Sequence, residues 1–79
     1  MLKRLSQYIN DDEFRMTIYE NKIHIINFKR ILSLEDNYIS FQNNHQKISI
    51  IGNKLVLNKL LEKEVLIKGI ILKIEVSNE

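Results

Sequence analysis

A chain of 79 residues is the size of one small domain, and its 12 basic and 10 acidic residues leave a formal net charge of only +2. The hydrophobic residues include 14 isoleucines and 10 leucines but no alanine, a composition that favours strands over a helical bundle. The lack of cysteine and the wide separation of the two glycines exclude disulfide scaffolds, thiolate metal sites and glycine-rich phosphate loops.

The first thirteen residues form a segment of their own. Leu2, Leu5 and Ile9 have helix-like spacing, which predicts one short N-terminal helix. An acidic triplet at residues 11–13 ends this pattern. We therefore place an N-terminal segment at 1–13, a single β domain at 14–76 and a tail at 77–79.

From Phe14 onward the hydrophobic residues alternate with polar ones in short runs. The runs begin near residues 14, 22, 30, 38, 46, 54, 64 and 70. Their alternating apolar residues are the predicted inner face: Phe14/Met16/Ile18, Ile23/Ile25, Leu32/Leu34, Ile39/Phe41, Ile48/Ile50, Leu55/Leu57, Val65/Ile67 and Ile70/Leu72/Ile74/Val76. Period-two alternation predicts strands, and connections this short normally join antiparallel neighbours. The pattern predicts a mainly all-β fold, an antiparallel meander of about eight short strands arranged as a sandwich or a small barrel-like sheet. A β-solenoid-like stack is the alternative.

Asparagine and glycine mark the turns of the predicted sheet. Asn21 lies between two strand-like runs, and Gly52-Asn53 is the strongest hairpin signal in the chain. Gly69 lies inside the apolar stretch 65–76, where glycine is typical of a bulge or bend. Residues 60–63 lack alternation and indicate a short helical turn or a crossing loop.

A second set of apolar side chains falls on the face opposite the predicted core. A sheet with one solvated face would alternate more cleanly, so this second set needs cover from inside the chain or from another molecule. It is the candidate interaction face: Ile26, Ile51, Val56, Leu66 and Ile71.

The polar residues form no recognisable catalytic or metal-binding pattern. His24 and His45 have no further ligands at a known metal-site spacing. Ser33, Ser40 and Ser49 alternate along strands without the base and orienting acid that a nucleophile needs. We expect a non-enzymatic protein without cofactor or metal.

Binding of single-stranded nucleic acid by a small β-barrel is the alternative function. Six lysines lie between Lys47 and Lys73, but all six aromatic residues lie in the N-terminal half. Stacking platforms combine cations and aromatic rings, which favours a protein partner over nucleic acid.

No apolar run is longer than three residues, whereas a membrane-spanning helix needs about 20. We therefore expect no membrane span and no secretory leader, and an intracellular protein.

The motif ISIIGNKLVLNKLLEKEVLIKGIILKIEV, within a longer matching stretch at 14–76, resembles the YabP/YqfC family of sporulation proteins. A strand ending in Ile-x-Gly is followed by Leu-x-Leu, a leucine-containing connector and a closing Val-x-Ile-x-Gly-x-Ile strand. The family positions would be filled by Gly52, Leu55, Leu57, Leu60, Val65, Ile67, Gly69 and Ile71.

The resemblance implies a role in spore formation in endospore-forming bacteria. It implies a structural or adaptor protein of the mother-cell cytoplasm, at the forespore membrane surface, that helps to build the forespore envelope. The partner would be a membrane protein encoded nearby. Apart from the resemblance, a homo-oligomer is one way to cover the second apolar set. The family supplies no catalytic residues to carry over.

Overall fold

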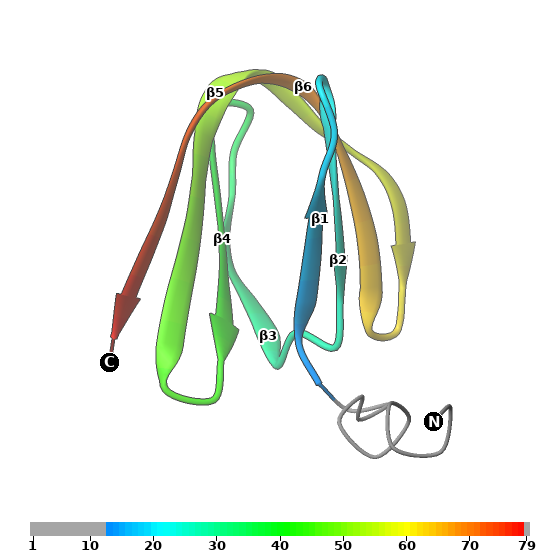
Figure 1. Cartoon of the computed structure of the whole chain (residues 1–79). Coiled ribbons are helices and arrows are strands. Elements are labelled where there is room, and N and C mark those ends of the chain that lie inside the picture. Colours follow the sequence, from blue (N-terminus) through cyan, green and yellow to red (C-terminus); the bar gives the residue numbers. More distant parts are fainter. Residues whose placement is uncertain (1–12, 79) are drawn as a thin grey trace, which may run out of the picture.

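A computed structural model describes residues 13–78, and these form an all-β structure (Figure 1). The predicted antiparallel all-β class is confirmed, with six strands in one sheet. Apart from Glu13, the helix predicted over 1–13 lies outside the described residues. The strands are β1 (Arg15–Ile18), β2 (Lys22–Ile26), β3 (Arg30–Leu34), β4 (Tyr38–Asn43), β5 (Gln46–Leu61) and β6 (Glu64–Asn78).

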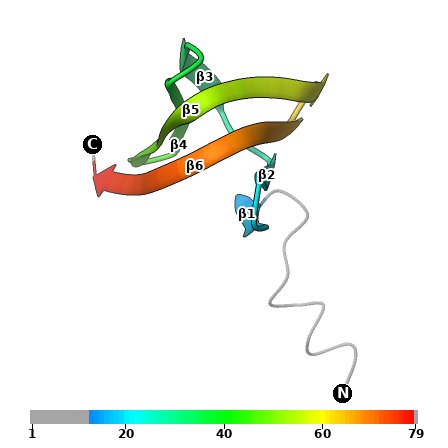
Figure 2. The same ribbon diagram turned by 90° about the horizontal axis from the view of Figure 1, so that it is seen from above.

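The sheet has the order β1-β2-β6-β5-β4-β3, so it is neither a simple meander nor a solenoid. The central pair, β5 and β6, is a hairpin of 16- and 15-residue strands. Each of these long strands has a second neighbouring strand along only one of its halves. β4 pairs with β5 along residues 46–51, and β2 pairs with β6 along residues 64–68. In Figure 2 the β1–β2 and β3–β4 hairpins lie on opposite sides of the central pair.

The long hairpin bends in its middle, so the two halves of the sheet face each other beneath an arch (Figure 1). Gly52 and Gly69 lie at this bend, where the β5–β6 pairing shifts register. A Cβ at Gly52 would overlap the carbonyl oxygen of Ile70, and Gly69 has φ of 143°, a backbone conformation that other residues rarely adopt. The bend expected at Gly69 is therefore present, and a sheet bent in this way resembles a sandwich without closing into a barrel.

The hairpin turn predicted at Gly52-Asn53 is wrong, because both residues lie within β5. The turn between β5 and β6 is formed instead by Glu62 and Lys63. At Gly52 the missing side chain allows close approach of the paired strand rather than a reversal of the chain. The apolar runs on either side of each glycine consequently join, which gives six strands where about eight were predicted.

The turns of the outer hairpins bind to the bend through backbone hydrogen bonds. In the β1–β2 turn, where a turn was predicted, Asn21 accepts a hydrogen bond from the Gly69 N–H at 3.2 Å. In the β3–β4 turn, the carbonyls of Asn37 and Asp36 accept from Gly52 at 3.1 Å and Leu55 at 2.7 Å. The turns of both outer hairpins are therefore hydrogen-bonded to the bend of β5 and β6.

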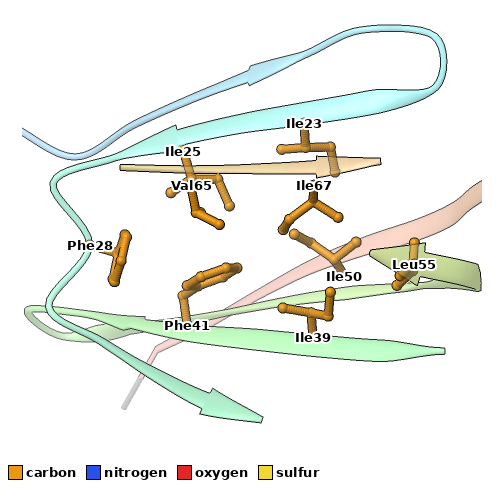
Figure 3. Close-up of a cluster of buried hydrophobic side chains, with 9 residues drawn as sticks. All are labelled: Ile23, Ile25, Phe28, Ile39, Phe41, Ile50, Leu55, Val65 and Ile67. Carbon is orange, nitrogen blue, oxygen red and sulfur yellow. The ribbon is translucent and has the colours of Figure 1, made fainter. Parts of the chain in front are cut away.

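The core fills the space between the two facing halves (Figure 3). Phe28, in the connection between β2 and β3, closes the end opposite the bend, with its ring centroid 5.3 Å from that of Phe41. Inward positions predicted from alternation are confirmed for most of the core. The buried cluster consists of Ile23, Ile25, Phe28, Ile39, Phe41, Ile50, Leu55, Val65 and Ile67.

Beyond Gly69, alternation predicts Ile70, Leu72, Ile74 and Val76 on the inner face, and of these only Ile74 packs against the core. Ile71 is on the core side because it continues the alternation of Val65 and Ile67. Lys73 then pairs with Ile51 and Ile71 with Gly52, which leaves Leu72 as an extra residue and exchanges the faces of β6, so that Ile74 is again on the core side.

Candidate interaction surface

The five residues of the candidate interaction face do not form one patch. Val56, Leu66 and Ile26 lie on the outer face of the half that contains β1 and β2. Ile51 lies on the outer face of the other half, opposite Tyr38, and Ile71 packs against the core. Val56 is 58% exposed, whereas the other four are half-buried. The sheet itself therefore covers much of this set, and Val56 is its accessible member.

The larger exposed apolar surface lies along the halves of the long hairpin that have no outer strand beside them. Of the ten large hydrophobic residues exposed in the described chain, six belong to β5 and β6. They are Val56, Leu60 and Leu61 on β5, and Ile70, Leu72 and Val76 on β6. Most of this surface was not predicted, because alternation placed Ile70, Leu72 and Val76 in the core. In the sequence, the one sign of the β5–β6 hairpin was the charged pair Glu62-Lys63, which separates two apolar runs.

These halves also carry free backbone edges. Within residues 13–78, the pairing of β5 with β4 stops at Ile51 and the pairing of β6 with β2 stops at Lys68. The N–H groups of Gly52, Leu55 and Gly69 still bind the outer turns, and past them each strand pairs only with the other, so one row of backbone N–H and C=O groups faces outward. Exposed apolar side chains beside a free edge are the features used in β-augmentation.

A polar cluster lies on the outer face of β4 and β5. The Tyr38 Oη and the Ser49 Oγ are 3.1 Å apart, and the Lys47 Nζ lies 6.0 Å from the centre of the Tyr38 ring. The hydrogen bond to Ser49 and the nearby Lys47 lower the pKa of Tyr38 below its ordinary value. Ser40 is buried beside Ser49, and its Oγ has no hydrogen-bond partner within the described structure.

The polar cluster places the Ser49 hydroxyl beside a phenol. Nucleophilic catalysis by a serine needs a general base beside the hydroxyl, and the partner of Ser49 is a phenol. His24 is on the other half of the sheet, where its Nε2 lies 3.4 Å from the Glu64 Oε1. Across residues 13–78, no three His, Cys, Asp or Glu side chains gather where they could hold a metal ion.

Comparisons with protein-family models, curated proteins and solved structures found no significant match for this chain. The part of the chain that the structure describes contains no helix long and apolar enough to cross a membrane. The resemblance to the YabP/YqfC family therefore rests on the sequence motif alone.

Proposed function

We propose that this chain is a non-enzymatic sporulation protein that acts as a structural or adaptor component of the forming forespore envelope. The observation that supports a binding role is the concentration of exposed apolar side chains along the free edges of β5 and β6. The sporulation context comes from the family resemblance over residues 14–76.

Exposed apolar residues along both free halves of one hairpin favour contact with another protein. Single exposed hydrophobic residues are ordinary, but several beside an open sheet edge are a hazard for aggregation unless a partner covers them. Covering Val56, Leu60 and Leu61 would remove apolar area from water and complete the edge with backbone hydrogen bonds. By resemblance, the partner is a membrane protein encoded nearby, met at the forespore membrane surface from the mother-cell cytoplasm.

The placement of the aromatic rings favours this function over binding of single-stranded nucleic acid. Phe28 and Phe41 lie in the core, and the Tyr38 phenol is engaged with Ser49. Within residues 13–78, Tyr19 is the aromatic residue among the exposed large hydrophobics, with the Lys22 Nζ 5.0 Å from its ring centre, and it supplies one stacking position there. A strand of nucleic acid binds to several stacked rings along a basic groove, so one position supports the alternative poorly.

The role is tested by deleting the gene in the source organism and counting heat-resistant spores. We expect the deletion to lower the count and the wild-type gene to restore it. The variant Val56→Glu should restore it incompletely, since it places a charge on the accessible apolar face while Lys68 opposite can pair with the new carboxylate. Thr17→Glu, which adds the same charge to an exposed position of β1, is the matched control and should restore the count fully.

Normal spore counts in the deletion strain, or an organism that forms no endospores, would contradict the sporulation role. If Val56→Glu restored the spore count fully, Val56 would not be part of the contact surface. Binding of the purified chain to a labelled oligonucleotide at low salt, with steep weakening at physiological salt, would favour the nucleic-acid alternative.

A further inference from the structure

The longest free edge in the described structure belongs to the C-terminal half of β6. Residues 70–78 pair with β5 on one side, and no described strand lies on the other. At about 3.4 Å a residue, this edge is about 30 Å long. Natural proteins usually shorten, bend or cover an edge of this length, so its side chains should indicate what pairs with it.

The charges on this edge are opposite and two residues apart. Lys73 and Glu75 lie on the same face, with 3.9 Å between Nζ and Oε2, and their side chains are 64% and 53% exposed. On the opposite face, Ile74 pairs with the buried Ile50 and Val76 with the buried Ile48. The edge therefore presents an apolar strip on one face and a Lys-x-Glu pair on the other.

We propose that two copies of this chain pair antiparallel through β6, about a two-fold axis at Ile74. Lys73 of each copy then lies opposite Glu75 of the other, and Leu72 lies opposite Val76. The two charge pairs are equivalent by symmetry, so the contact is self-complementary. The bent sheets of the two molecules continue into each other, and this inference is independent of the proposed role in sporulation.

The register follows from strand geometry and charge. Backbone groups point alternately to the two sides of a strand, so antiparallel copies of one edge can pair only where the two residue numbers sum to an even number. An axis at residue 73 would place Lys73 opposite itself, and an axis at residue 75 would place Glu75 opposite itself. Both of these registers bring like charges together. The intermediate register, with the axis at Ile74, pairs Lys73 of each copy with Glu75 of the other.

The other edges of the described sheet are poorer candidates for self-pairing. The free part of β5, residues 56–61, carries Lys59 and no acidic residue, so two copies would bring only positive charges together. β1 has only four residues, and β3 is interrupted by an irregularity at Leu32. The β6 edge alone combines length with complementary charges.

Sedimentation velocity of the full chain over a range of concentrations tests the proposal. A single strand pair buries less area than a standard interface, so we expect a reversible dimer that dissociates on dilution. Lys73→Glu or Glu75→Lys should each raise the dissociation constant on the order of tenfold, since both symmetric pairs become repulsive. The double variant with both changes restores opposite charges in the same register and should recover the wild-type constant.

A single cysteine identifies the axis, because the natural chain has none. Residues facing each other across an antiparallel pair have Cα atoms about 4.5–5.5 Å apart, a separation that a disulfide spans. Ile74→Cys should therefore cross-link into a covalent dimer on mild oxidation. In the matched control Ser77→Cys, the two cysteines would be six residues apart, or about 20 Å, and should not cross-link.

A chain that stays monomeric at all concentrations would overturn the proposal, as would capture of this edge by another protein with no self-association. A dimer unaffected by the single charge reversals, or cross-linked as well at residue 77 as at 74, would also overturn it. Circular dichroism of each variant establishes that loss of the dimer is not loss of the fold, since residues 73 and 75 are exposed.

Discussion

Replacing Gly52 by alanine tests whether the arch depends on the close approach of its two central strands. The new Cβ would overlap the Ile70 carbonyl oxygen and lie 3.0 Å from the Leu55 Cδ2. The leucine methyl can move, but the carbonyl belongs to the backbone of the paired strand. The two strands must therefore separate at the bend, where the turns of both outer hairpins are attached.

The expected loss of stability follows from two opposing effects. Overpacking against a rigid neighbour costs about 1–3 kcal/mol, and a backbone neighbour favours the upper end of that range. Removing a glycine from the unfolded chain returns about 0.4–1 kcal/mol. The net loss is about 2 kcal/mol. For a domain of this size, whose total stability is about 4–12 kcal/mol, this lowers Tm by about 8–16 °C.

Urea unfolding followed by circular dichroism measures this change, with Asn53→Ala as the matched control. Asn53 is the exposed neighbour on the same strand, so its replacement should alter the free energy of unfolding by less than about 0.5 kcal/mol. If Gly52→Ala is as stable as the control, the two strands do not approach closely at the bend, and close approach is refuted as the reason for glycine at residue 52.

Three further predictions concern the end of the core and the polar cluster. Phe28→Ala should lower the free energy of unfolding by about 3 kcal/mol, since it empties the space beside Phe41, and a loss below about 1 kcal/mol would contradict the role of Phe28 in closing the core. Ser49→Ala should raise the pKa of Tyr38 toward its ordinary value, measured by an NMR pH titration of the tyrosine ring carbons, and an unchanged pKa would contradict the assigned hydrogen bond. Because the folded state favours the Tyr38 phenolate, the free energy of unfolding should rise as pH increases from the folded-state pKa to about 10, and Ser49→Ala should reduce that rise.

The core of this fold is largely predictable, because alternation is a local signal. Ile23, Ile25, Ile39, Phe41 and Ile67 occupy strands whose faces are set by a period of two, and all five are buried. Phe28 was missed as a core residue, because it comes from a connection rather than from a strand and no periodicity marks it. Its burial depends on where the two halves of the sheet meet.

The candidate surface was less predictable than the core. Val56 was correctly placed on an outer face, but Ile71 is packed inward because it continues the alternation of Val65 and Ile67. The extra residue at Leu72 then exchanges the faces of β6, so that Ile74 is again on the core side. A one-residue shift reverses every side chain beyond it, and alternation alone does not reveal such a shift.

The sequence by itself determined the class of the fold, the positions of most strands and the identity of most core residues, since each depends on spacing between near neighbours. Only the tertiary structure decided that Gly52 and Gly69 lie within the two strands of one long hairpin, with Gly52 opposite Ile71, rather than separating shorter strands. That pairing joins residues far apart in the chain and bends the sheet onto itself. It leaves β6 with a long unpaired edge, and Lys73 and Glu75 acquire significance as a pair because they lie on that edge.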